Sequence, residues 1–171
     1  MIVNETNINF EVFDGGNRLL GMASVDLPEI SFKTSDVSGG GIAGELSVPV
    51  TGATESLELT LHWRTLYKDA VKYLRHNVIN LSARAALQNY DSSKGEVKIS
   101  PLRIDFRGRV KGVGLGSLKP AEQMESETKI ECDYLKIKVD GNTTCEIDKY
   151  GYVYSVNSVD FMSDVRHALG L

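Results

Sequence analysis

The sequence predicts a mainly β protein, in which two packed antiparallel sheets form a sandwich or partly open barrel with one flanking α-helix and long loops. Two observations favour this class. Apolar and polar residues alternate over most of the chain, and clusters of Gly, Asn and Asp separate the alternating segments. The 171 residues, 42% of them hydrophobic and 25% charged, fit one domain over residues 1–171 whose core needs no disulfide or metal.

The clearest strand pattern in the first half of the chain covers residues 57–64. Leu57, Leu59, Leu61 and Trp63 alternate there with Glu58, Thr60, His62 and Arg64. One face of this strand is therefore predicted to be buried and the other wet. Earlier strands are expected at residues 8–13 and 19–27, with a turn at residues 14–17 between them, and at residues 45–50.

The second half of the chain repeats the alternation. Residues 81–88 and 102–107 are predicted to pair as antiparallel strands around a loop at residues 90–95. Residues 129–139, 144–148 and 152–156 indicate a further meander. About nine strands result.

One segment, residues 65–76, has helical spacing instead. Its apolar stripe consists of Leu66, Ala70, Val71 and Leu74. Thr65 is a candidate N-cap, so we expect a helix that packs against the strands. A shorter helix is expected at residues 160–168, ended by Gly170.

Two long segments carry no core pattern. Residues 28–43 contain Gly39, Gly40 and Gly41, and residues 112–127 contain Gly112, Gly114 and Gly116. Both exceed the usual length of a connection within a compact domain, and long loops are often functional. We therefore expect both segments to contact partners. The second does not open a helix, so it is interpreted as a flexible loop and not as a phosphate cradle.

Composition disfavours several classes of function. A net charge of -4 without a basic cluster argues against a general nucleic-acid binder. The N-terminus has no signal-peptide pattern, and no apolar run is long enough to span a membrane. We expect a soluble protein, made in the cytoplasm, that needs no cofactor.

The two cysteines are predicted to be reduced. If a turn at residues 140–142 closes a hairpin, Cys132 faces a position near Tyr150 and Cys145 faces a position near Ile137, so the thiols miss each other.

No catalytic pattern is found. His62, His76 and His167 fall on separate elements and are interpreted as surface or capping residues, and the Cys and His spacing fits no zinc site. Tyr150, Tyr152 and Tyr154 could stack on sugars or bases, but their period of two is more typical of one strand face.

A series of motifs runs along the chain: a leucine-proline-acidic element, a polar run, a glycine triplet that leads into a strand, and strand and turn motifs up to the C-terminus. They lie in residues 24–34, 39–46, 105–109, 116–120, 134–141, 146–148, 156–160 and 168–171. In their order and spacing these segments resemble the major tail tube protein family of contractile-tailed phages. The resemblance covers nearly the whole chain.

The resemblance implies a non-enzymatic structural subunit with the tail-tube type of fold. Six copies close into a ring whose inner sheets form one barrel, and the rings stack into a hollow tube. Implied partners are the subunit itself, the tail sheath protein, the tape-measure protein, and DNA that passes without specific binding. The implied location is the tail tube of a virion or tail-like particle, assembled in the host cytoplasm.

The resemblance also directs attention to particular residues. We expect the segment at residues 28–43 to dock on the neighbouring ring, and the residues proposed for this contact are Pro28, Glu29, Lys33, Gly39, Gly40 and Gly41. Polar strand faces are candidates for the lumen, where acidic side chains would repel DNA phosphates. These candidates are Ser24, Asp26, Glu45 and Ser47, and an ordinary solvated outer face is the alternative for each.

Two other functions stay open at this point. The first belongs to the same structural class, the tube of a headless bacteriocin or injection particle that carries no DNA. The second belongs to a different class, a small monomeric β-sandwich module that binds sugars or peptides.

Overall fold

The computed structural model describes all 171 residues and is dominated by antiparallel strands. The strands are β1 (Ile2–Asp14), β2 (Asn17–Arg18), β3 (Met22–Asp26), β4 (Phe32–Ser38), β5 (Glu45–Thr54), β6 (Glu58–Trp63), β7 (Val78–Asp91), β8 (Glu96–Gly114), β9 (Ser126–Val139), β10 (Asn142–Asp148), β11 (Val153–Val156) and β12 (Val159–Asp160). Two short helices, α1 (Lys68–Lys72) and α2 (Ser163–Leu169), and a 3₁₀ turn (Tyr73–Arg75) complete the chain.

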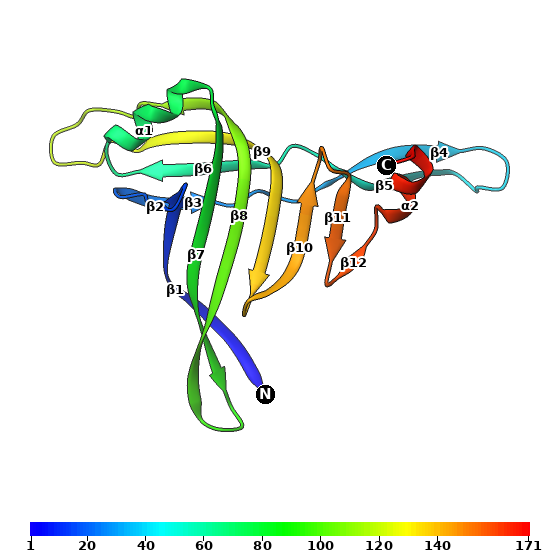
Figure 1. Ribbon diagram of the computed structural model, residues 1–171, viewed down its shortest axis with the longest axis horizontal. Helices are drawn as coiled ribbons and strands as arrows, with labels where there is room; N and C mark the ends of the chain where they lie inside the picture. Colours follow the sequence, from blue (N-terminus) through cyan, green and yellow to red (C-terminus); the bar gives the residue numbers. More distant parts are fainter.

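Ten of the strands form one sheet that branches at β9. Along one edge β9 pairs with β8, whereas its other edge is shared by two partners: β6 opposite residues 126–131 and β10 opposite residues 134–139. Beyond β6 lies β3, and beyond β8 lie β7, β1 and β2. The strands β3 and β6 therefore run across the strands β1, β7 and β8, so that the branched sheet folds into two layers (Figure 1).

The branch point is a β-bulge at Asp133. Arg107 pairs with Tyr134 and Gly108 pairs with Cys132, so Asp133 is an extra residue in β9. The Arg107 side chain donates a hydrogen bond from Nε to Asp133 Oδ1 at 2.6 Å. Gly108 is required because a Cβ atom there would lie 2.3 Å from the carbonyl oxygen of Glu131. Here β9 leaves one layer and enters the other.

The core lies between the two layers. The β6 face predicted to be dry is buried, with Leu59, Leu61 and Trp63 at most 1% exposed. The facing layer contributes Val12, Leu81, Ile104 and Phe106, and the branch strand contributes Ile130, Cys132 and Leu135. Trp63 donates its indole hydrogen bond to Thr128 Oγ1 at 3.1 Å, which satisfies the one polar atom of that side chain.

The predicted fold class is confirmed: the protein is mainly β, with two antiparallel sheets, a flanking helix and no closed barrel within the chain. The pairing of the strands predicted at residues 81–88 and 102–107 is also confirmed, with Leu81 opposite Phe106. So is the short second helix, which ends at Gly170 in the left-handed conformation. Cys145 faces Ile137 as expected, whereas Cys132 lies opposite Gly108.

Several predicted boundaries are wrong. Residues 19–27 are not one strand, because Leu19 turns back to donate its amide hydrogen bond to Val12 and Gly21 adopts a left-handed conformation before β3. Only Tyr154 of the three tyrosines lies in a strand, since Tyr150 and Tyr152 occupy the preceding turn. The structure has twelve strands, whereas about nine were predicted. The three additional strands, β2, β4 and β12, have no clear alternation of apolar and polar residues that would have predicted them.

The first helix is shorter than predicted. It begins at Lys68 with Tyr67 as N-cap, so Thr65 is not the cap, and His76 in a left-handed conformation ends the segment. The buried residues are Ala70 and Tyr73, whereas Val71 and Leu74 are exposed. Tyr73 is the buried large side chain of this segment because its ring packs beside Trp63 and its hydroxyl donates a hydrogen bond to Asp14.

The segments expected to be loops are partly strand. Residues 32–38 of the first segment form β4, because their backbone pairs with β5 even though their sequence does not alternate. In the second segment β8 extends to Gly114 and β9 begins at Ser126, so the loop is confined to residues 115–125. Backbone pairing decides both cases, of β4 with β5 and of the end of β8 with β9, and no local alternation in either segment indicates this pairing.

Truncation of a core residue should be costly. Leu59 is 1% exposed between the layers, and Leu118 is 84% exposed in the loop. We expect Leu59→Ala to lower the free energy of unfolding by about 2–5 kcal/mol, and Leu118→Ala by less than about 0.5 kcal/mol. Urea denaturation of the unassembled protein measures both values, and equal effects would contradict this placement of the core.

Candidate functional site

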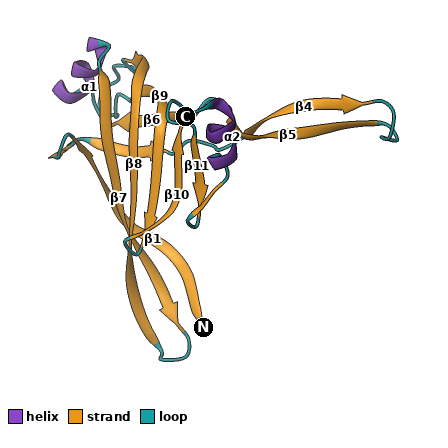
Figure 2. Cartoon of the chain, turned by 45° about the vertical axis from the view of Figure 1, so that its right-hand side comes forward, coloured by secondary structure: helices purple, strands orange, loops and turns teal.

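The most distinctive feature outside the core is a long β-arm. Strands β4 and β5 pair only with each other and form a separate two-stranded sheet. They continue β3 and β6 outward, and the arm projects far from the rest of the molecule (Figure 2). Every residue from Phe32 to Thr51 is exposed. An isolated two-stranded ribbon is marginally stable in water, so this arm is an element that needs a partner.

The arm has one apolar and one polar face. Val37 lies opposite Leu46, and Ser35 lies opposite Val48, which places three apolar side chains on one face. On the other face Asp36 lies opposite Ser47, and Ser38 lies opposite Glu45. Val37, Leu46 and Val48 are 39%, 55% and 37% exposed, and no part of the chain covers them. A contiguous exposed apolar stripe is typical of an interaction surface.

The root of the arm is held firmly by the C-terminal part of the chain. The Phe32 ring packs edge-on against Tyr154 at 5.5 Å between centroids, and Tyr154 packs against Phe161 at 5.7 Å. On the returning strand, Gly52 has a φ of +67° and lies against the buried side chain of Met162, whose sulfur would be 2.1 Å from an added Cβ atom. The arm is therefore fixed in direction at its base.

A network around Glu131 secures the connection from β5 to β6. The Glu131 carboxylate accepts hydrogen bonds from the Ser56 hydroxyl and the Leu57 amide, and it lies within ion-pair distance of Lys149 and Lys111. Lys149 also donates to the carbonyl oxygen of Glu55. Partial burial opposes ionisation, but these hydrogen bonds and charges outweigh it and hold the pKa of Glu131 below its ordinary value.

The residues predicted for ring stacking lie along this arm. Pro28 and Glu29 connect β3 to β4 at the root, and Lys33 belongs to β4. Gly39, Gly40 and Gly41 form the turn at the tip, where the Ile42 amide donates to the carbonyl of Gly39. The structure thus spreads the predicted set over the length of the arm, and its role in stacking stays a prediction.

The lumen candidates fall into two separate groups. Ser24 and Asp26 are exposed on β3, while Glu45 and Ser47 are on the polar face of the arm. Sequence reasoning missed two side-chain contacts on the polar face around β3: Asp26 contacts His62 at 2.8 Å, and Glu58 contacts Lys111. The alternation of His62 and Glu58 with buried residues is the signal that points to them.

The other candidates for chemistry are isolated. His62 contacts Asp26, whereas His76 and His167 lie in exposed helical termini. Burial raises the pKa of the Cys132 thiol to about 12, which is the environment of an unreactive cysteine. No three His, Cys, Asp or Glu side chains lie together in a way that could hold a metal ion.

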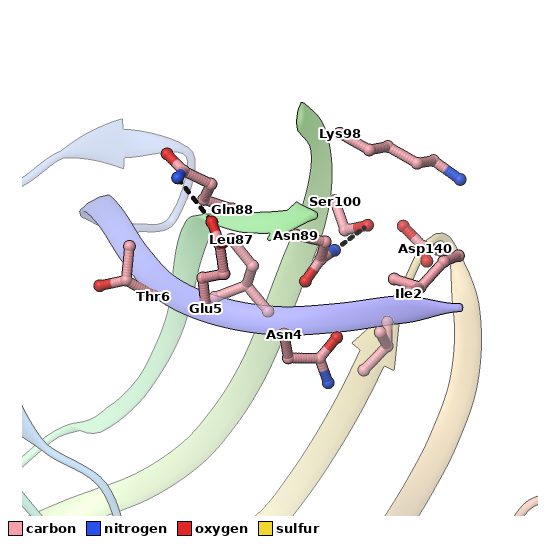
Figure 3. A pocket seen from close by; sticks show the side chains of 11 residues that line it. Ile2, Asn4, Glu5, Thr6, Leu87, Gln88, Asn89, Lys98, Ser100 and Asp140 are labelled. Atoms are coloured by element: carbon pink, nitrogen blue, oxygen red, sulfur yellow. Dashed lines mark hydrogen bonds between the residues drawn. The ribbon is translucent and has the colours of Figure 1, made fainter. Parts of the chain in front are cut away.

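A cavity of about 340 Å³ lies where the N-terminal part of β1 crosses β7 and β8 (Figure 3). Four of its polar side chains are paired with one another: Asn89 donates to Ser100 Oγ at 2.8 Å, and Gln88 donates to Glu5 at 2.8 Å. The first bond joins β7 to β8, and the second holds β1 against this hairpin.

No helix in the structure has the length and apolar character needed to cross a membrane.

The main sheet carries an exposed amphipathic arm, and its candidate catalytic side chains lie apart from one another. This combination is typical of structural proteins that assemble through their strands. Comparison with known proteins identifies the family. The family of phage tail tube protein FII matches residues 5–170, and the chain belongs to this family. It is a structural subunit of a tail tube.

Relatives from two phages cover almost the whole chain. The tail tube protein of Escherichia phage P2 is 30% identical over 165 residues, which are 94% of each chain. The major tail tube protein of Serratia phage KSP20 is 23% identical over 159 residues, covering 92% of this chain and 91% of the relative. The family resemblance expected from the residue motifs is therefore confirmed.

Two solved structures share the fold. Both come from an extracellular contractile injection system, PVC, in the extended state. A chain of the sheath/tube terminator matches with a TM-score of 0.51 and 14% identity, covering 77% of this chain and 94% of that one. A chain of the sheath-tube complex matches with a TM-score of 0.50 and 14% identity, covering 75% and 87%. The fold is thus found in contractile machines.

Loss of the Glu131 carboxylate should weaken the arm root in a pH-dependent way. Because the folded-state pKa of Glu131 is lowered, its contribution is present at neutral pH and is lost as the pH falls through that pKa. We expect Glu131→Gln to unfold at a lower temperature than the wild type at pH 7, and the difference to shrink below about pH 4. Thermal melts across this pH range measure it.

The control for this prediction is Glu125→Gln, since Glu125 is exposed and forms no ion pair. A Glu131→Gln deficit that stays constant down to acidic pH would contradict the role of the carboxylate.

Proposed function

We propose that this protein closes six-membered rings that stack into the tube of a contractile phage tail, without enzymatic activity. The observation that carries the proposal is the arm, whose apolar face of Val37, Leu46 and Val48 is uncovered in the single chain. Association with a second subunit would remove that face from water, which is the main driving force of most protein assembly.

Closure into a ring would also give the free sheet edges a backbone partner. Strands β3, β4 and β5 each have an edge without a backbone partner, and exposed edges of this kind promote uncontrolled aggregation. A barrel continued from subunit to subunit removes these edges altogether. The fold likeness to chains of PVC sheath and tube assemblies supports the same architecture.

The tip of the arm is the proposed contact between rings. Gly39 and Gly41 have positive φ angles, and a Cβ atom added at either position would meet no other atom within 4 Å, so the turn lies in open space where it can contact another surface. Lys33, Pro28 and Glu29, nearer the root, belong to the same proposed contact.

The polar strand faces are the proposed lining of the lumen. Asp26 and Glu45 give an acidic character, while Ser24 and Ser47 add small hydroxyl groups, so that DNA phosphates are repelled and slide. The tape-measure protein would occupy the same channel before DNA, and the sheath protein would surround the tube. The particle is proposed to be a virion assembled in the host cytoplasm, since both curated relatives are phage proteins.

The two alternatives have less support. A headless injection particle shares the fold, but its chains are only 14% identical to this one. The monomeric ligand-binding module is disfavoured by membership of a tail tube family over residues 5–170.

The arm makes the proposal testable with a matched pair of variants. We expect Leu46→Asp/Val48→Asp to remain folded, since both residues are exposed, and to form no tubes because charges replace the apolar contact. Ser47→Asp, on the opposite face, should still form tubes. Negative-stain electron microscopy of the concentrated proteins decides, and normal tubes from the double variant would contradict the proposal.

A reversed charge on the polar face tests the lumen assignment. We expect tubes of Glu45→Lys to have normal length and to retain short duplex DNA that wild-type tubes release, because lysine attracts phosphates. Nuclease protection separates DNA held inside the tube from DNA on its outside. Retained DNA that is fully digested would place Glu45 outside the channel.

A further inference from the structure

The layer made by β3 and β6 does not extend as far as the layer beneath it. β3 pairs with β6 along one edge, and its other edge has no partner. The strands β1, β7 and β8 continue past this edge (Figure 1). Part of their core-facing surface is therefore left without a cover.

A cavity of about 360 Å³ marks this uncovered surface. Eight of its eleven lining residues are hydrophobic. Ala83 and Ala85 form a low floor on β7, with Leu102 beside them on β8, and Leu27, which is 50% exposed, stands at the rim just after β3. Small floor residues under a free strand edge leave room for side chains from outside.

We propose that this cavity and the free edge of β3 receive the arm of a second copy of this chain. The arm supplies what the site lacks: a strand for the edge, and an apolar face of Val37, Leu46 and Val48 for the cavity. The arm continues the line of β3 and β6, so a copy displaced along that line brings its arm alongside β3 (Figure 1). The inference rests on the proposed self-assembly and names the surface that accepts the arm.

The polarity of the two faces of the arm agrees with this pairing. With its apolar face on the cavity, the arm turns its polar face outward, as the polar face of β3 with Ser24 does.

The contact joins two different surfaces of identical chains. Such a heterologous contact repeats from copy to copy until it closes a ring or grows as a filament. It also brings the two separate groups of polar residues, on β3 of one copy and β5 of the next, onto one continuous sheet.

Complementation between two defective variants tests the inference. Leu46→Asp/Val48→Asp has a damaged arm and an intact cavity, whereas Ala85→Glu has an intact arm and a filled cavity. We expect each to sediment as a monomer alone, and an equimolar mixture to yield a dimer of one copy of each, because only one productive contact is possible. Sedimentation velocity measures the species, and circular dichroism verifies folding.

Two further variants complete the experiment. Ala86→Glu lies on the opposite face of β7 and should assemble like the wild type. Leu27→Asp, at the exposed rim, should replace Ala85→Glu in the complementation if the latter fails to fold. Folded cavity variants that form normal tubes, or a mixture that stays monomeric, would overturn the inference. If the wild type forms tubes in the same experiment, the proposed function is unaffected by that result. A wild type without any self-association would overturn both.

Discussion

The fold depends on strand β9, which pairs with both β6 and β10 along the same edge. The change of partner happens at Asp133, which β8 leaves unpaired, and the Arg107 guanidinium contacts this residue and Asp148 of β10. Gly108 allows the backbones to approach at the same point. Without this bulge β9 would continue in one layer, and the core between β6 and β8 would have no second side.

The same branch point determines where the arm can start. Glu131, two residues before Asp133, binds Ser56 and Leu57, and these residues connect β5 to β6. The direction of the arm is therefore set by the strand that divides the layers, and the ring packing of Phe32 with Tyr154 fixes it from the other side. The direction of an arm that projects far from the core thus depends on contacts near the core.

The arm combines a root that is stabilised inside the chain with a length that is not. Phe32 and Gly52 at the root pack against the C-terminal part of the chain, while the apolar face of Val37, Leu46 and Val48 stays uncovered. Acidic residues on the opposite face and glycines at the tip limit unspecific pairing of the exposed edges. The polar cavity beside β1 differs from the arm, because four of its side chains form hydrogen bonds within the chain.

The sequence by itself determined the fold class, the dry face of β6, the antiparallel pairing of β7 with β8, the second helix and the family, because these follow from local alternation, turns and ordered motifs. It did not determine β4, since the segment around Val37 lacks alternation and becomes a strand only by pairing with β5. The branch at Asp133 and the separation of Ser24 from Ser47 likewise required the tertiary structure. They depend on contacts between residues distant in the chain, which no local pattern encodes.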